Sequence, residues 1–350
     1  GWACEPWFQK DMPIDEAFAK EQAAKTNKAL YIIGRTAGED KDNAIWQGSY
    51  ILTDEEKENL RNITKAFDNV CIVLNVSNII DLSWINDEEY NGSIKSVIIV
   101  WQGGMEGGTA VVDVLSGAET PSGKLADTIA YSIEDYPSTK NFGNEFKNLY
   151  EEDIYIGYRY FETFAPDKVQ FEFGYGLSYT TFDIETQTVK EKTDSIELNV
   201  KVTNTGDKFA GKEVVQVYVK APQGVLGKPA RALVGFAKTG ILAPGAKETV
   251  TINVAKESFA SYDDSGATGH KSCYVLEEGS YEFYVGSDVR SAAFAGAYEQ
   301  PFKVVETLTE AMAPVEAFER MKAVAGEDGT LKPGYEAAPL RTVDPAKRMK

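Results

Sequence analysis

SIELNVKVT, residues 195–203, alternates polar and apolar side chains at every position. Successive residues of a β-strand point to opposite faces, so this pattern predicts a strand with one face in a core. A turn signal, Asn204-Thr205-Gly206-Asp207, follows directly. Residues 180–304 are therefore predicted to form an all-β sandwich of immunoglobulin-like size. Three further segments repeat the pattern at sandwich-like spacing: Glu213–Lys220, Lys247–Val254 and Gly279–Gly286.

The preceding region, residues 1–135, has a different rhythm. Short, continuous apolar runs alternate there with helical patterns, which is typical of parallel strands covered on both faces. This part is predicted to be an α/β domain. The predicted strands are Ala29–Gly34 (ALYIIG), Val70–Val76 (VCIVLNV) and Ser96–Trp101 (SVIIVW).

Helices are predicted between these strands. The second of them begins with a capping box, in which Thr53 is the N-cap and Glu56 stands three residues later. Its apolar residues then recur at helical spacing, at Leu60, Ile63 and Phe67. The other two predicted helices are Ile14–Thr26 and Gly107–Leu115.

Two segments lack a clear domain pattern. Residues 136–179 are irregular and rich in Tyr, Phe and Gly, which predicts a strap or connector between domains. Residues 305–350 are predicted to leave the sandwich as a linker, with a helix over Leu308–Val324 followed by a Gly/Pro-rich stretch.

Composition excludes several classes of function. A net charge of −18 argues against nucleic acid as a partner, and no apolar run reaches the length of a membrane span. A single histidine, His270, argues against histidine triads and multi-histidine metal sites, and no cofactor is predicted. The odd number of cysteines (Cys4, Cys71, Cys273) and the lack of a signal peptide favour the cytoplasm. The sequence leaves open whether the chain forms a homo-oligomer.

The densest cluster of ionisable groups is the loop of residues 35–43, directly after the first predicted strand. Active sites in open α/β sheets lie at the carboxyl ends of strands. Glu39 is the candidate proton donor there, and the neighbouring Asp40 and Asp42 would raise its pKa, as a general acid requires. The alternative interpretation is a solvated surface turn, a common place for acidic residues.

Three tryptophans lie in or beside the predicted strand-end loops: Trp46, Trp84 and Trp101. Aromatic rings can stack on the apolar faces of sugars, but tryptophan is also common in protein cores. Trp46 and Trp101, with Arg35 and Asp42, are the candidate substrate-binding residues.

Several stretches resemble glycoside hydrolase family 3. They are WQGGMEGG (101–108), DVL (113–115), PSGKL (121–125), EDIYIGYRYF (152–161) and FGYGLSYT (173–180). The stretches NTG (204–206) and GKEVVQVYV (211–219) resemble the fibronectin-III-like domain of that family.

The resemblance implies a function. Family members pair a (β/α)8 barrel, which carries an Asp nucleophile, with an α/β sandwich domain whose acid/base lies in a Gly-Glu pair after a strand. Gly38-Glu39 occupies that place. Many members read Gly-Glu-Gly-x-Asp-Arg; here Asp42 matches, whereas Asp40 and Asn43 replace the second Gly and the Arg. The implied activity is retaining hydrolysis of a β-glucoside or oligosaccharide.

The resemblance also implies what the chain lacks. Nothing resembles the barrel, its nucleophile motif or the first part of the α/β domain, and some bacterial members are circularly permuted with the barrel last. This chain is therefore predicted to supply the acid/base and to need a barrel chain or segment for activity. The alternative is a non-catalytic carbohydrate-binding or scaffolding protein. A nucleotide-binding protein is disfavoured because no phosphate loop is present.

Overall fold

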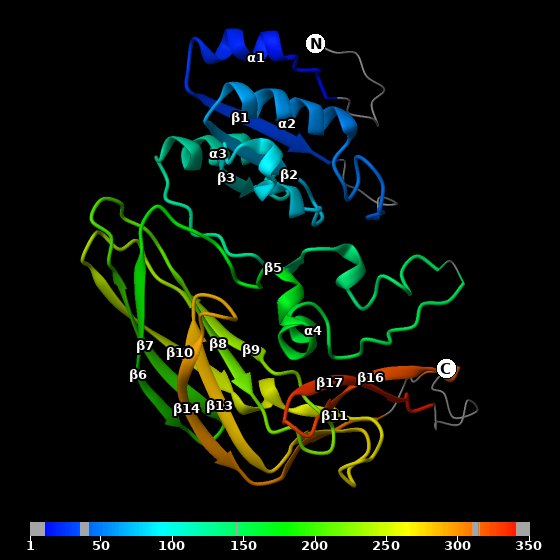
Figure 1. The fold of residues 1–350 in the computed structure, drawn as a ribbon. Coiled ribbons are helices and arrows are strands. Elements are labelled where there is room, and N and C mark those ends of the chain that lie inside the picture. Colours follow the sequence, from blue (N-terminus) through cyan, green and yellow to red (C-terminus); the bar gives the residue numbers. More distant parts are fainter. Residues whose placement is uncertain (1–10, 36–41, 145, 310–313, 315, 341–350) are drawn as a thin grey trace. The chain divides into compact units, whose positions relative to one another are not determined.

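The computed structural model describes residues 11–35, 42–144, 146–309, 314 and 316–340. The chain divides into two compact units, one formed by residues 1–119 with 131–133 and the other by residues 120–130 with 134–350 (Figure 1). The first unit holds the α/β elements and the second holds the sandwich.

The first unit is built on a parallel sheet in the order β1-β2-β3. Each strand corresponds to one of the predicted apolar runs, so these predictions are confirmed. β1 and β2 pair without a break in register, with Ile33 opposite Leu74, and both side chains are fully buried. The strands are β1 (Lys28–Gly34), β2 (Asn69–Asn75) and β3 (Ile94–Ile99).

Helix α2 begins where the sequence signals it, whereas α1 is shorter than the predicted Ile14–Thr26. The predicted capping box is confirmed: the Thr53 hydroxyl accepts from the Glu56 N–H at 3.0 Å, and the Glu56 carboxylate accepts from the Thr53 N–H at 2.8 Å. Leu60 and Ile63 lie on the buried side of this helix. The elements are α1 (Glu16–Ala23), α2 (Asp54–Ala66), η1 (Ser83–Asn86), η2 (Glu88–Tyr90) and α3 (Gly107–Ser116).

The second unit includes the predicted strap, residues 136–179, which contains the short helix α4 (Tyr158–Phe164). Phe161 is its fully buried anchor. The Tyr158 ring stacks on Phe173 with centroids 4.5 Å apart, and its hydroxyl accepts from the Leu233 N–H at 2.8 Å. Aromatic packing therefore fastens the strap to the sandwich. The other elements are β4 (Ile129–Ala130), η3 (Ile133–Asp135), η4 (Pro166–Lys168) and β5 (Val169–Phe171).

Two antiparallel sheets, in the orders β10-β7-β6 and β14-β13-β8-β9, form the predicted sandwich. The alternation of residues 195–203 becomes an alternation of burial, in which Ile196, Leu198, Val200 and Val202 all enter the core. A small sheet, β11-β12-β15, completes the domain. The elements are β6 (Phe182–Glu191), β7 (Ser195–Asn204), β8 (Val214–Lys220), β9 (Ala232–Lys238), β10 (Lys247–Ala255), η5 (Lys256–Phe259), β11 (Ser261–Asp263), β12 (Cys273–Leu276), β13 (Gly279–Gly286), β14 (Ala293–Gln300) and β15 (Lys303–Thr307).

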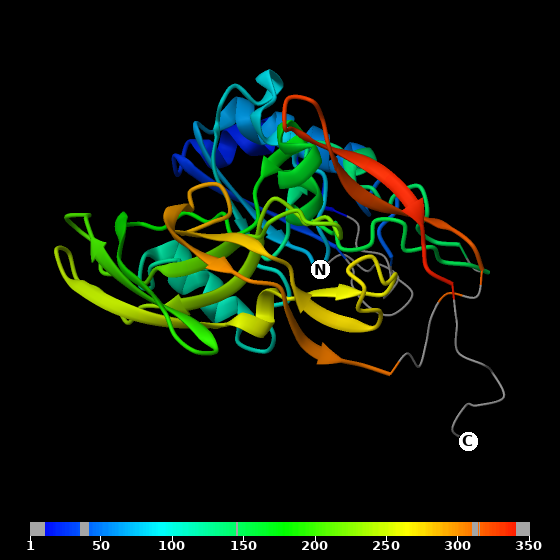
Figure 2. The same cartoon turned by 90° about the horizontal axis from the view of Figure 1, so that it is seen from below.

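The prediction of a helix over Leu308–Val324 is wrong. Its last residues instead form β16 (Glu319–Ala325), which pairs with β17 (Leu331–Ala337) in an antiparallel hairpin. Good helix formers fill this segment, but pairing with a partner strand overrides that propensity. In Figure 2 the hairpin (orange to red) runs beside α4.

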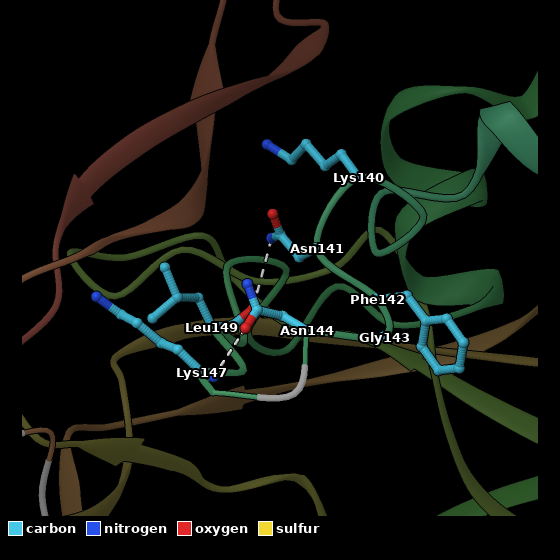
Figure 3. Close-up of a pocket in the computed structure, with 7 residues that line it drawn as sticks. All are labelled: Lys140, Asn141, Phe142, Gly143, Asn144, Lys147 and Leu149. Carbon is cyan, nitrogen blue, oxygen red and sulfur yellow. Dashed lines mark hydrogen bonds between the residues drawn. The ribbon is translucent and has the colours of Figure 1, made fainter. Parts of the chain in front are cut away.

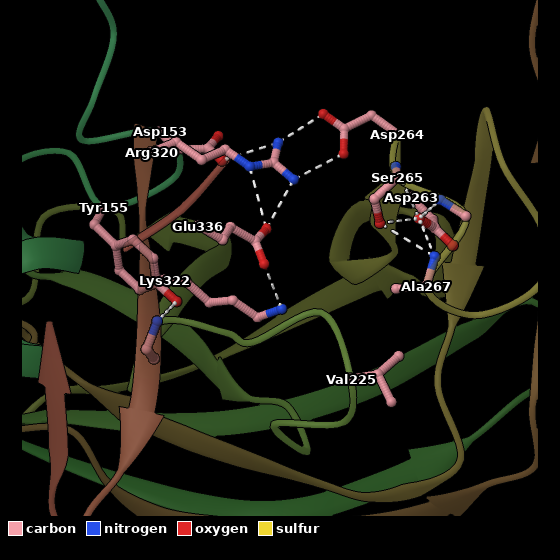
Figure 4. A network of polar contacts seen from close by, with 12 residues as sticks. Asp153, Tyr155, Val225, Asp263, Asp264, Ser265, Ala267, Arg320, Lys322 and Glu336 are labelled. Carbon is pink, nitrogen blue, oxygen red and sulfur yellow. Dashed lines mark hydrogen bonds and ion pairs between the residues drawn. The ribbon is translucent and has the colours of Figure 1, made fainter. Parts of the chain in front are cut away.

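A network of ion pairs holds the hairpin to the rest of the unit (Figure 4). The Arg320 guanidinium forms two hydrogen bonds to Asp264, at 2.6 and 2.9 Å, and ion pairs with Asp153 at 3.3 Å and Glu336 at 3.0 Å. Lys322 reaches the same Glu336 carboxylate at 2.8 Å. Burial raises the pKa of Asp153, so this carboxyl depends on the nearby cation to stay charged. Arg320 thus joins the strap, a sandwich loop and both hairpin strands.

Arg320→Met is expected to loosen the hairpin, with a cost of about 2 kcal/mol, because three carboxylates lose their shared cation in a partly buried place. Amide hydrogen exchange of β16 should accelerate correspondingly. Lys322→Met is the matched control and should cost under about 1 kcal/mol, because this side chain reaches one half-exposed carboxylate. Equal exchange rates in the two variants would show that Arg320 does not hold the hairpin.

Asp263, the last residue of β11, organises the loop that follows it. Its fully buried carboxylate accepts hydrogen bonds from the backbone and hydroxyl groups of Ser265–Thr268, including the Gly266 N–H at 2.6 Å and the Thr268 hydroxyl at 2.6 Å. Burial alone would raise the pKa of Asp263, but these hydrogen bonds outweigh it and lower the pKa to about 2.

This lowered pKa predicts an acid-sensitive loop. A carboxyl that binds protons more weakly in the folded than in the unfolded chain stabilises the fold above its unfolded pKa, and that stability is lost as the pH falls. For Asp263 the contribution is about 2 kcal/mol, complete above about pH 5 and lost toward pH 2. Urea titrations at successive pH values should show Asp263→Asn less stable at pH 7, with a flatter acid limb than the unmodified chain. Parallel pH profiles would contradict the assignment.

Candidate functional site

The carboxyl ends of the three parallel strands meet at one edge of the first unit. The backbone joins them there: the Arg35 N–H donates to the Asn75 carbonyl at 3.1 Å, and the Val100 N–H donates to the Leu74 carbonyl at 2.9 Å. The strand-end loops that carry the predicted site residues therefore start side by side. Trp101 follows β3 with a φ of +55° and is half-buried.

The predicted proton donor, Glu39, and its neighbour Asp40 lie outside the described residues. The described chain ends at Arg35 before them and resumes at Asp42, whose side chain is exposed. The acid/base role of Glu39 and the substrate contact of Asp42 stay predictions.

Arg35 is anchored at the base of this loop. Its guanidinium is buried and forms a two-pronged pair with Glu56, at 2.5 and 2.9 Å. The same group donates to the Gly34 carbonyl at 2.9 Å and to the Ser49 carbonyl at 3.0 Å. These bonds fix the end of β1 to the start of α2. The predicted contact of Arg35 with substrate stays a prediction.

The turn after Asp42 carries Trp46. The Asn43 side chain donates to the Ile79 carbonyl at 2.8 Å, which ties this turn to the loop after β2. The Ala44 N–H donates to the Ser49 hydroxyl at 3.1 Å, so the turn closes on the residue whose carbonyl binds Arg35. Trp46 stands on this turn with 65% of its surface exposed. The structure therefore brings Arg35 and the Trp46 turn together.

Trp84, unlike Trp46, lies in the core of the first unit. Its side chain is buried, its indole N–H donates to the Asp81 carbonyl at 2.7 Å, and its ring meets Tyr90 edge-on at 6.2 Å. These contacts are those of a core tryptophan.

The same edge gathers further acidic groups. Burial and the nearby Glu56 carboxylate raise the pKa of Asp11, while Arg35 acts in the opposite direction. Three charged side chains thus meet beside the end of β1, which makes the electrostatics of this edge sensitive to each of them.

Sequence reasoning missed the partnership of Arg35 with Glu56. A signal was present, because Glu56 lies four and seven residues before Leu60 and Ile63, on the apolar face of α2. A carboxylate on a buried helix face needs a cation or hydrogen-bond donors. The pattern identified the helix cap, but it could not identify a partner 21 residues away.

A cavity of about 430 Å³ lies in the second unit, within the strap (Figure 3). Both of its lysines have partners, since Lys140 pairs with Glu151 at 2.9 Å and Lys147 pairs with Glu316. None of the lining residues is a carboxylate, so the cavity offers no acid/base pair for glycoside chemistry. The lining residues are Lys140, Asn141, Phe142, Gly143, Asn144, Lys147 and Leu149.

Within the described ranges, no group of three or more His, Cys, Asp or Glu side chains is arranged to hold a metal ion. No helix in that part of the chain has the length and apolar character needed to cross a membrane.

Two family profiles match the chain. Residues 11–179 match the profile of the glycosyl hydrolase family 3 C-terminal domain, and residues 213–289 match that of the fibronectin type III-like domain.

Individual relatives carry the likeness along nearly the whole chain. A β-glucosidase of Ruminococcus albus is 51% identical over 349 residues, which are 99% of this chain and 36% of that protein. Beta-glucosidase A of Butyrivibrio fibrisolvens is 38% identical over 379 aligned residues, covering 96% of this chain and 45% of its own length. The chain thus spans less than half the length of these relatives.

Solved structures share the fold. A β-glucosidase from Paenibacillus barengoltzii superposes with a TM-score of 0.95 at 55% identity, over 98% of this chain and 38% of that one. β-Glucosidase 3B from Thermotoga neapolitana gives 0.76 at 33% identity, over 86% of this chain and 42% of that one. The chain therefore belongs to glycoside hydrolase family 3, with a match to the C-terminal domain of that family followed by a match to its fibronectin type III-like domain.

Proposed function

We propose that this chain is the acid/base-bearing part of a retaining β-glycosidase of the β-glucosidase type. The observation that carries the proposal is the place of Gly38-Glu39 in the sequence, four residues after the end of β1, which matches the Gly-Glu pair after a strand that the resemblance to family 3 implies. Its relatives in Ruminococcus albus and Butyrivibrio fibrisolvens are β-glucosidases.

The mechanism needs two carboxyl groups. In a retaining glycosidase they stand about 5–5.5 Å apart across the bond to be cleaved. One attacks the anomeric carbon and forms a covalent intermediate, while the other protonates the leaving oxygen and then activates water. Glu39 takes the second role. The nucleophile is an Asp of a (β/α)8 barrel. The part of the relatives that this chain does not match is long enough to contain such a barrel.

The described residues support this role by fixing both sides of the loop that carries Glu39. Arg35, before the loop, is bonded to Glu56 and to the carbonyl of Ser49, which lies after it. A rigid base lowers the cost of holding a catalytic group in place. Trp46, exposed on the adjoining turn, is the proposed platform for a sugar ring, with Asp42 and Trp101 as further contacts.

The second candidate is a non-catalytic carbohydrate-binding protein, which the exposed Trp46 favours. The two functions differ in what the isolated chain does. A binding protein would bind glucose or cellobiose alone, with heat measurable by isothermal titration. An enzyme part whose sugar site is shared with a barrel would show little binding.

The test is an activity measurement on two proteins: this chain, and the complete enzyme made by joining it to the part of the Ruminococcus albus β-glucosidase that it does not match. The complete enzyme should hydrolyse cellobiose and the chain alone should not. Because a joined protein can fail to fold, replacing the residue of the Ruminococcus albus enzyme that aligns with Glu39 by glutamine or alanine provides a second route. Turnover by the isolated chain, or a normal rate for that variant, would overturn the proposal.

A further inference from the structure

Another cavity of the second unit, with a volume of about 320 Å³, is lined by charged side chains. Three segments that are far apart in the sequence form it: α4, the residues before β9 and the turn after β13. Two guanidinium groups and one carboxylate line the cavity beside two small apolar side chains. Its size suits a small molecule, and its polar groups determine which kind. The lining residues are Glu162, Ala230, Arg231, Val289 and Arg290.

Arg231 is held in place without a counter-charge. Its Nη1 donates to the Val289 carbonyl at 3.0 Å and to the Ala292 carbonyl at 2.9 Å. The guanidinium carbon lies 3.9 Å from the centre of the Tyr284 ring, which is a cation–π contact. A guanidinium has more N–H donors than these two bonds use. Among the described residues no carboxylate forms an ion pair with Arg231. The fold therefore fixes this cation and leaves its charge uncompensated.

Arg290 and Glu162, by contrast, pair with each other. The Arg290 Nε donates to one carboxylate oxygen of Glu162 at 3.0 Å, and its Nη2 donates to the Pro166 carbonyl at 2.6 Å. Only 13% of the Glu162 side chain is exposed. Burial raises the pKa of Glu162, although both arginines of the cavity act in the opposite direction. A carboxylate in such a place gains from additional hydrogen-bond donors.

The lining as a whole has one positive charge in excess. Glu162 neutralises Arg290, and no other carboxylate lines the cavity. Asp288 is close in sequence, but its carboxylate accepts from the N–H groups of Arg290 at 2.9 Å and Ser291 at 2.6 Å, so it serves the turn itself. An anion with a single charge would balance Arg231, whereas a dianion would exceed that charge. The planar donors of arginine match a carboxylate in a two-pronged pair.

We propose that this cavity binds a small hydroxycarboxylate, such as a sugar acid. The carboxylate of the ligand pairs with Arg231, and one of its hydroxyls donates to Glu162. Ala230 and Val289 contact its carbon chain. The ligand thus supplies the negative charge and the hydrogen-bond donor that the lining lacks. The inference does not depend on the proposed activity, because the cavity shares no residue with the strand-end loops of the first unit.

Saturation-transfer NMR on this chain tests the site, with sodium gluconate as the probe. Gluconate should bind with a dissociation constant on the order of 1 mM. Glucose has the hydroxyls without the carboxylate, so an excess of glucose should not displace gluconate. Acetate has the carboxylate without the hydroxyls and should bind at least about tenfold more weakly. Displacement by glucose, or inorganic phosphate binding as tightly as gluconate, would overturn the proposal.

Two variants locate the binding. Ala230→Leu fills the cavity and keeps its three charged groups, so the affinity for gluconate should fall at least about tenfold. Arg231→Met removes the cation and should lose as much. Lys192→Met is the matched control, because it removes a half-exposed cation from the same unit and should leave the affinity unchanged.

Arg231 also anchors two carbonyls, so Arg231→Met can fail to fold. Ala230→Leu is therefore the decisive variant, and near-ultraviolet circular dichroism checks that it keeps the native fold. Unchanged gluconate affinity in folded Ala230→Leu would overturn the proposal. So would the absence of gluconate binding by the unmodified chain.

Discussion

Replacing Glu39 with glutamine in the complete enzyme is expected to lower kcat for cellobiose by about two to four orders of magnitude. Glutamine keeps the shape of the side chain but cannot give a proton to the leaving oxygen. The glucose leaving group of cellobiose departs poorly without that proton, so this substrate reports the missing acid most strongly. Steady-state hydrolysis of cellobiose is the measurement.

Two variants separate the acid/base role from a general disturbance of the loop. Glu39→Ala should regain activity on an activated aryl glucoside when azide is added, because azide needs no general base to attack the glycosyl-enzyme intermediate. Glu58→Gln, at an exposed glutamate of α2 outside the proposed site, is the control and should keep most of the cellobiose activity. A near-normal cellobiose rate for Glu39→Gln would place the acid elsewhere.

Replacing Glu56 with alanine should destabilise the first unit by about 3–5 kcal/mol. The change leaves the Arg35 guanidinium buried without its counter-charge and also removes one half of the α2 capping box. Since β1 and α2 both lose an anchor, their amides should exchange far faster with solvent. Hydrogen exchange of β1 and α2, together with urea denaturation, measures the effect.

Glu58→Ala provides the control on the same helix. Because Glu58 is exposed, this substitution should lower the free energy of unfolding by less than about 1 kcal/mol. The double variant Arg35→Met/Glu56→Leu should recover much of the lost stability, since paired apolar groups need no counter-charge. If Glu56→Ala costs no more than Glu58→Ala, the buried pair does not hold the strand end.

Local sequence patterns predicted those elements whose buried face or end is marked by nearby residues. The alternation at residues 195–203 specified which side chains enter the sandwich core, because a strand has two faces and one of them must be buried. The Thr53–Glu56 box likewise located the start of α2. The hairpin β16–β17 escaped prediction because its strands are stabilised by each other and by Asp153 and Asp264, which no local window contains.

The candidate site shows the same division. The position of the strand-end loops followed from the apolar runs, and the structure confirms that the loops start at one sheet edge. The use of individual side chains did not follow. Arg35 in a polar loop suggests a group that meets substrate, whereas its guanidinium is bonded to Glu56 and two carbonyls. A pairing across 21 residues depends on how α2 packs on β1, which composition and periodicity do not encode.

The Arg320 network also bears on the order of events during synthesis. Asp153 and Asp264 leave the ribosome well before the arginine that neutralises them, and Glu336 comes later still. Contacts between residues far apart in sequence form late and slow folding. A nascent chain that ends near residue 304 would contain strands β6 to β14, but Asp153 and Asp264 would lack the cation that pairs with them. The second unit can therefore be completed only once its last strand has emerged.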